Sequence, residues 1–141
     1  MEKISFDTGV RSYKLGEGVL KLNPGDPNLY GRFLEGAEQL RQMEKQMVEK
    51  AATADPEIGL LQLMQDMDRQ MKQILDWIFT GNEFDRLLGG VNLLAVADNG
   101  QRVITNLFTA LEPVLVEGAE RCAAAGAEAA VGKAKARRGS R

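Results

Sequence analysis

The sequence predicts a mainly α-helical α+β domain, in which a short N-terminal antiparallel β-hairpin or meander precedes a three-helix antiparallel bundle. Residues 3–22 alternate polar and apolar side chains, the period-two pattern of half-buried strands. Farther along, three long segments repeat apolar residues at intervals of three and four, the spacing of an amphipathic helix. A chain of 141 residues is long enough for one domain with its own hydrophobic core.

Three short strands are expected at the N-terminal end. Polar and apolar side chains alternate in residues 3–7 and 10–15, which lie on either side of a turn at Thr8-Gly9. Residues 19–22 follow a second glycine-containing turn. A lone hairpin of this size is marginally stable in water. We therefore expect its apolar face to pack on the helices or on another chain.

The first two helices begin at the same dipeptide. Asp-Pro at residues 26–27 and 55–56 supplies a capping carboxylate followed by a proline suited to the first helical position. Helices are therefore predicted over residues 27–52 and 56–80, with Gly81 ending the second one. The connection of about three residues between them favours an antiparallel pair.

The third helix is predicted to follow a glycine hinge. A one-turn helical knuckle over residues 83–88 leads to Gly89-Gly90, and the helix is predicted over residues 92–122. Pro113 removes a backbone donor and clashes with the preceding turn, which predicts a kink near this residue.

The C-terminal segment differs in composition from the single domain of residues 1–122. Residues 123–141 are rich in alanine and glycine and have little apolar surface to bury, so we expect a frayed or disordered tail. Its last nine residues carry five basic side chains and no acidic one, which leaves 13 basic and 20 acidic residues, a net charge of −7, on the rest of the chain. Such an acidic body is not expected to bind nucleic acid, so residues 133–141 are the only candidate for that role. The alternative is that residues 133–141 form a solvated, disordered end of the chain with no binding role.

No catalytic, cofactor or metal site is predicted. The chain has no histidine, the commonest general base and transition-metal ligand. Cys122 has a neighbouring cation in Arg121 but no base partner, so a packed or inert thiol is expected. No glycine-rich segment matches a phosphate-binding or dinucleotide-binding loop. We therefore expect a non-enzymatic protein.

Two pairs of acidic residues are candidate metal ligands. Asp66 with Asp68, and Glu83 with Asp85, are separated by one intervening residue. On a helix such residues face different directions and cannot share a metal ion. Solvated surface or helix capping is the expected role of each.

The sequence predicts a cytoplasmic protein that does not enter a membrane. It has no run of about 18 uninterrupted apolar residues, and its first residues lack the apolar run of a signal peptide. The single cysteine cannot form an internal disulfide, in agreement with a reducing compartment.

A stripe of methionines is the candidate partner-binding surface. Its members lie on the first two predicted helices: Met43, Met47, Met64, Met67 and Met71. Methionine is flexible and recurs on surfaces that accept several apolar partners. The same helix faces carry leucines that must be buried, so packing between the two helices is the alternative. Trp77 and Phe79, at the end of the second helix, could anchor either the core or a partner site, and the core is the favoured prediction.

Two segments resemble a known family. They are Asn-Pro-Gly-Asp-Pro-Asn-Leu-Tyr-Gly-Arg-Phe, at residues 23–33, and Ile-Phe-Thr-Gly-Asn-Glu-Phe-Asp-Arg-Leu-Leu-Gly-Gly-Val-Asn-Leu-Leu, at residues 78–94. Together with the preceding strands they resemble the small tail assembly chaperones of long-tailed phages and prophages of Gram-positive bacteria. In that family a glycine-rich stop ends the second helix, and an aromatic-Gly-Gly turn and an asparagine open the last one. Leu88 stands here in place of the aromatic residue, and the resemblance covers about residues 3–120.

The resemblance implies a non-enzymatic role in tail morphogenesis, in which the protein holds the tape measure protein, the tail tube protein or both during assembly. The edges of the N-terminal strands would serve self-assembly into a homo-oligomer or the binding of a tube subunit. One alternative is a structural tail or head-tail component of the virion. A second is a regulatory module that uses the basic tail on nucleic acid.

Overall fold

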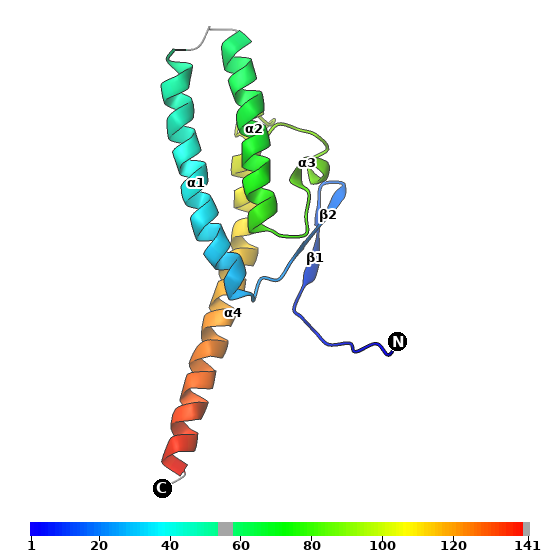
Figure 1. Ribbon diagram of the computed structural model, residues 1–141, viewed down its shortest axis with the longest axis vertical. Coiled ribbons are helices and arrows are strands. Elements are labelled where there is room, and N and C mark those ends of the chain that lie inside the picture. Colours follow the sequence, from blue (N-terminus) through cyan, green and yellow to red (C-terminus); the bar gives the residue numbers. More distant parts are fainter. Residues whose placement is uncertain (54–57, 140–141) are drawn as a thin grey trace.

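The computed structural model of the protein describes residues 1–53 and 58–139, with the backbone alone for residues 58 and 127–139. Within these residues the fold is mainly helical, with four helices and a short antiparallel hairpin of two strands near the N-terminal end, which confirms the predicted class. The elements follow in the order β1 (Arg11–Leu15), β2 (Gly18–Leu22), α1 (Pro27–Ala51), α2 (Ile58–Ile78), α3 (Phe84–Leu87) and α4 (Val103–Gly139) (Figure 1).

The helices α1 and α2 form an antiparallel hairpin, as their short connection predicts (Figure 1). α1 begins at its predicted residue, and the Asp26 carboxylate accepts a hydrogen bond from the Asn28 amide at 2.9 Å. The two helices approach closely at Gly36, where a Cβ atom would lie 2.3 Å from Cδ1 of Ile78. The predicted helix start at residues 55–56 lies outside the described residues.

The strands β1 and β2 pair through a two-residue turn, with Tyr13 opposite Leu20. Leu20 and Leu22 are buried, so one face of the hairpin packs on the core. Asn82 closes the outer edge of β2 in place of a third strand. Its Oδ1 accepts a hydrogen bond from the Lys21 amide at 2.9 Å, and its Nδ2 donates to the Lys21 carbonyl at 2.7 Å.

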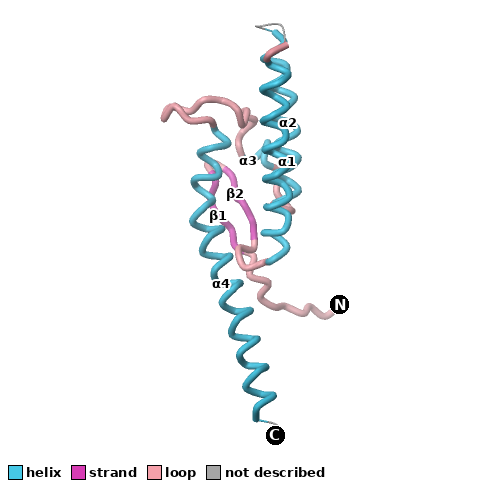
Figure 2. The backbone as a smooth tube through the Cα atoms, turned by 90° about the vertical axis from the view of Figure 1, so that its left-hand side faces the viewer, coloured by secondary structure: helices cyan, strands magenta, loops and turns pink. Residues whose placement is uncertain are grey.

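The strand predicted over residues 3–7 is wrong, because no regular structure precedes β1 in the described residues. Gly9 has a positive φ of 80°, and its amide donates to the Asp7 carboxylate at 2.8 Å. The side-chain amide of Asn23 donates to the Thr8 carbonyl at 2.6 Å. These contacts fix a turn, and the segment before it extends away from the helices (Figures 1 and 2).

The last helix begins at Val103, so its predicted start near Asn92 is wrong. The segment between α3 and α4 forms turns and one isolated antiparallel bridge. Asn92 Oδ1 accepts a hydrogen bond from the Leu94 amide at 2.8 Å, and this single side-chain turn is not continued as a helix. Gly100 then adopts a positive φ of 80°, a conformation that a right-handed helix does not contain.

The helix α4 continues through Pro113 to Gly139. The backbone of residues 123–139 is thus helical, and fraying of this segment stays a prediction. Alanine has the highest intrinsic helix propensity, which explains a helical backbone in this segment. The C-terminal part of α4 projects well beyond the other elements (Figures 1 and 2). The kink near Pro113 stays a prediction.

The first part of α4 packs against α1 and the connection that precedes it. The Tyr30 hydroxyl lies 2.6 Å from the Pro24 carbonyl and 2.8 Å from the Leu115 carbonyl, and it shares its single hydrogen between them. Burial raises the pKa of this hydroxyl. The rings of Phe33 and Phe108 meet edge to face with centroids 6.1 Å apart. These few contacts join α4 to the α1–α2 hairpin, but they do not confirm a regular three-helix bundle.

The core lies where the end of α2, α3, β2 and the segment before α4 meet. The largest fully buried side chains are Phe79, Phe84, Leu20, Leu75, Ile78, Leu93 and Pro24. The prediction that Phe79 is a core residue is confirmed, whereas Trp77 is 41% exposed and its prediction as core is wrong.

Substitution of Gly118 tests how α4 is attached. A Cβ atom at this residue would lie 2.0 Å from the Pro24 carbonyl oxygen, a backbone atom that cannot rotate aside. Gly118→Ala should therefore lower the free energy of unfolding by about 2 kcal/mol or more, as measured by urea denaturation.

The matched control is Gly31 in α1, which is exposed. In the described part of the chain, no non-neighbouring atom lies within 4 Å of the position that its Cβ would take. Gly31→Ala should raise the free energy of unfolding by about 1 kcal/mol, because alanine has the higher helix propensity. A Gly118→Ala protein as stable as wild type would contradict the described packing.

Candidate functional site

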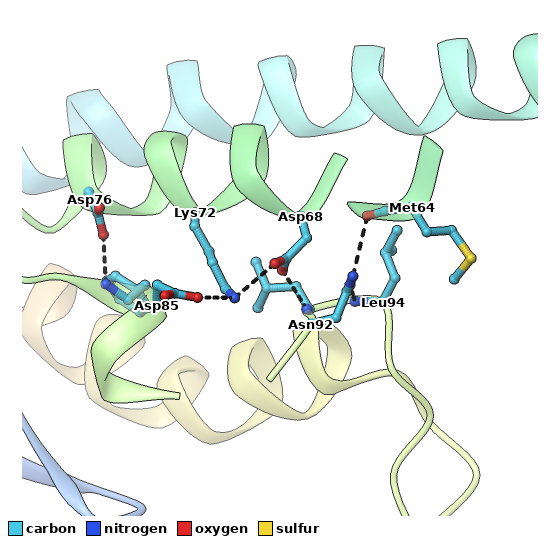
Figure 3. A network of polar contacts seen from close by, with 9 residues as sticks. Met64, Asp68, Lys72, Asp76, Asp85, Asn92 and Leu94 are labelled. Atoms are coloured by element: carbon cyan, nitrogen blue, oxygen red, sulfur yellow. Dashed lines mark hydrogen bonds and ion pairs between the residues drawn. The ribbon is translucent and has the colours of Figure 1, made fainter. Parts of the chain in front are cut away.

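One polar stripe on α2 organises the segments that follow this helix. Asp68, Lys72 and Asp76 are spaced four residues apart, so they lie one above another on the same side of α2 (Figure 3). The Lys72 ammonium donates hydrogen bonds to Asp68 Oδ2 at 2.8 Å and to Asp85 Oδ1 at 2.6 Å. Because Asp85 belongs to α3, this ion-paired group joins α3 to α2.

The charge of Lys72 is buried with the help of both carboxylates. Its side chain is only 6% exposed, and that of Asp68 is 13% exposed, whereas the Asp85 side chain is 72% exposed. Burial disfavours the charged ammonium, but the hydrogen bonds to Asp68 and Asp85 and the charges of these carboxylates outweigh this effect. The pKa of Lys72 is therefore raised above its ordinary value.

The same stripe also holds backbone amides of the following segments. Asp68 Oδ1 accepts a hydrogen bond from the Leu93 amide at 2.7 Å, and Asp76 Oδ1 accepts one from the Phe84 amide at 2.8 Å. Phe84 and Leu93 are the residues that insert their side chains fully into the core. The stripe therefore satisfies the backbone donors of the segments that carry these two apolar side chains.

Asp68 and Asp85 do more than the solvated or capping role that the sequence predicts. Asp68 is buried between Lys72 and the Leu93 amide, so the surface role predicted for it is wrong. Asp85 is exposed as predicted, yet it also binds Lys72. The four-residue spacing of Asp68, Lys72 and Asp76 is the sequence signal that these pairwise considerations missed.

The other members of the pairs agree with their predicted surface roles. Asp66 is exposed and pairs with Arg69 one helical turn away. Glu83 is exposed at the start of α3 and makes no side-chain capping bond. Among the side chains that the structure describes, those of residues 1–53 and 59–126, no group of three or more cysteine or acidic residues is placed to hold a metal ion. The contacts that the polar stripe does make are ion pairs and hydrogen bonds to backbone amides.

A separate apolar groove of about 480 Å³ lies between α1, α2 and the first turns of α4. Its apolar lining includes Phe33, Leu40, Met47, Met67, Met71 and Phe108. Arg41, Glu44 and Arg102 add charged groups to this lining. Pockets of a few hundred cubic ångströms with apolar walls and few polar groups are typical of binding sites.

One wall of the groove depends on the segment before α4. Leu94 and Arg102 both line the groove, and the Arg102 guanidinium donates to the Leu94 carbonyl at 2.5 Å. The neighbouring Leu93 amide is held by Asp68. The side-chain amide of Asn92 also donates to the Met64 carbonyl of α2 at 3.3 Å. The polar stripe thus fixes the position of this wall.

Only some of the five methionines of the predicted stripe lie in the groove. Met47, Met67 and Met71 line the groove together, whereas Met43 and Met64 do not. Met43, Met67 and Met71 are also at least nine-tenths buried, so they contribute to the packing of α1 on α2. Core packing and a surface role are therefore compatible for Met67 and Met71, and partner binding by the stripe stays a prediction.

Two other candidates lie outside the groove. Cys122 is half-buried on α4, and no disulfide forms. The side chains of residues 133–141 lie outside the described ones, so the basic tail stays an untested candidate for nucleic acid.

Comparison with known proteins finds no family model, curated protein or solved structure that matches this chain. In the part of the chain that the structure describes, no helix combines the length and apolar character needed to cross a membrane. Function is therefore inferred from the groove and from the residues that build it.

Asp68 and Asp85 bind the same lysine but should contribute differently to the free energy of unfolding. Asp68→Asn puts an amide against the buried Lys72 ammonium and should lower the free energy of unfolding by about 2–4 kcal/mol, because a buried charge loses its partner. Asp85→Asn should cost less than about 1 kcal/mol, because the Asp85 carboxylate is exposed to water. Guanidinium denaturation of the two variants measures both values. Equal losses would mean that burial does not determine the strength of these ion pairs.

The raised pKa of Lys72 predicts how stability depends on pH. Its contribution to the free energy of unfolding is complete below the ordinary pKa of 10.5 and is lost as the pH rises through the raised value. The difference in stability between wild type and Lys72→Met should therefore stay constant on the alkaline side of neutrality and shrink only above pH 10.5. Denaturation curves across this range measure the difference.

Lys45→Met supplies the control, because it removes an ammonium group that is exposed on α1 and should change the free energy of unfolding little. A wild-type advantage over Lys72→Met that already declines below the ordinary pKa would show that Lys72 is not stabilised in its charged form.

Proposed function

We propose that the protein is a non-enzymatic phage tail assembly protein, a chaperone that holds the tape measure protein, the tail tube protein or both during tail morphogenesis in the host cytoplasm. The observation that carries this proposal is the apolar groove between α1, α2 and α4, in which Met47, Met67 and Met71 lie together. The resemblance of residues 23–33 and 78–94 to tail assembly chaperones supplies the class of partner.

The groove suits the apolar face of a helical segment. A partner helix presents apolar side chains at intervals of three and four, and a groove between helices accepts such a row. Methionine side chains adapt their shape to different partners, as a protein that holds an unfinished assembly requires. Arg41, Glu44 and Arg102 beside the groove would orient the partner through its charged residues.

A structural tail or head-tail component retained in the virion is the second candidate, because the same groove would serve a permanent contact. Mass spectrometry of purified virions separates the two functions. A chaperone should be absent from the finished particle, whereas a structural component should be present in a fixed ratio to the tube protein.

A pair of neighbouring residues allows a matched test of the groove. Met47 lines the groove, whereas the adjacent Val48 does not and is 65% exposed. Co-expression with the tape measure protein should increase the soluble amount of that protein and allow co-purification. Met47→Glu should weaken this binding about tenfold or more, because a carboxylate would lose its hydration in the interface. Val48→Glu should bind as wild type does.

Two results would count against the proposal. One is that wild type neither solubilises nor co-purifies with the tape measure or tube protein. The other is that Met47→Glu and Val48→Glu, both still folded by circular dichroism, bind equally well, which would place the contact outside the groove.

A further inference from the structure

One edge of the β-hairpin pairs with no other strand among the residues that the structure describes. Ser12 of β1 and Lys21 of β2 are opposite residues of the antiparallel pair. The backbone amide and carbonyl of Lys21 both bind the side chain of Asn82, at the edge of β2 that is turned away from β1. In an antiparallel pair, the backbone N–H and C=O groups of two opposite residues either bond to each other or all point away from the partner strand. The amide and carbonyl of Ser12 therefore point out from β1, and those of Lys14, two residues on, do the same.

This outer edge of β1 is open in the described residues. Ser12 and Lys14 are exposed, and their backbone groups take part in no hydrogen bond outside the hairpin among those of the described residues. β2 separates β1 from the segment that carries Asn82, which closes the other edge of the sheet. An unpaired strand edge is a template for another strand.

The segment before β1 has the sequence pattern of a strand but belongs to no strand of the described structure. Residues 3–7 alternate polar and apolar side chains, with Ile4 and Phe6 as the apolar pair. Ile4 is 87% exposed and Phe6 is 78% exposed, although both have a high preference for strands. This segment of five residues matches the five residues of β1 in length.

A local turn keeps this segment away from its own β1 edge. Gly9 has a positive φ of 80°, and a Cβ atom there would lie 3.0 Å from Asn23 Oδ1. Asn23 in turn holds the Thr8 carbonyl, and the chain before this residue extends outward as an arm, residues 3–7 (Figures 1 and 2). The arm therefore lies away from the β1 edge of its own chain (Figures 1 and 2).

We infer that the arm, residues 3–7 of one copy, adds as a strand to the open β1 edge of a second copy. Two properties of the arm favour this occupant. Its alternation of polar and apolar side chains fits an added strand, and its Ile4 and Phe6 side chains are exposed. Strand addition also removes two exposed apolar side chains from water. This inference does not use the groove, and it specifies the contact behind the strand-edge self-assembly that the resemblance to tail assembly chaperones implies.

Two variants test the arm and the β1 edge separately. Ser12→Pro removes an amide that points outward, so the hairpin keeps its own hydrogen bonds while the edge loses a donor. Ser12→Ala is the matched control and keeps the amide. The arm variant Ile4→Ser/Phe6→Ser keeps the backbone but has no apolar side chains to bury.

Analytical ultracentrifugation of the full chain should show concentration-dependent self-association of wild type and Ser12→Ala. Ser12→Pro and the arm variant should each associate about tenfold or more weakly. A mixture of these two variants should regain a heterodimer, because an intact arm then meets an intact edge. Hydrogen exchange should show that the amides of Ser12 and Lys14 become protected as the concentration of wild type rises.

Three results would overturn the inference. The first is a wild type that stays monomeric with unprotected Ser12 and Lys14 amides at every concentration. The second is protection of these amides in a monomer, which would mean that the arm folds back on its own edge. The third is self-association that persists unchanged in Ser12→Pro and in the arm variant.

Discussion

A buried ammonium group is stable only where carboxylates surround it, and Lys72 obtains its two carboxylates from different parts of the chain. Asp68 lies one turn away on α2, whereas Asp85 arrives with α3. The charge of Lys72 therefore stabilises the arrangement in which α3 lies against α2. Asp68 then uses its second oxygen to hold the Leu93 amide, and Asp76 holds the Phe84 amide. Two chain segments are thereby attached to one face of a single helix.

This attachment determines the shape of the candidate binding surface. Leu93 is fully buried, and the adjacent Leu94 forms part of the groove together with Arg102. If the bond between Asp68 and Leu93 were lost, this wall would lose its fixed position relative to Met67 and Met71 on α2. Stability and the shape of the groove are thus coupled through one ion-paired network, although the groove itself contains none of its charged residues.

Local signals in the sequence predicted local structure well. The Asp26 cap and the helical spacing of apolar residues identified α1 and most of α2, and Phe79 was correctly assigned to the core. Contacts between distant segments were not predictable in this way. The pairing of Lys72 with Asp85, thirteen residues away, depends on how the glycine-rich connection turns. The segment after Asn92 was mistaken for a helix because its asparagine caps only a single turn. The methionine stripe was recognised, but its division between core and groove follows from where α4 packs.

Lys72 and Asp68 together hold the segment containing Leu93 against α2. Native-state hydrogen exchange at the Leu93 amide tests this attachment most directly. In wild type this amide should be protected nearly as strongly as the core amides of α2. In Asp68→Ala its protection should fall to that of an open loop while the α1 and α2 amides remain protected. A Leu93 amide that already exchanges rapidly in wild type, or that is equally protected in both proteins, would contradict the claim.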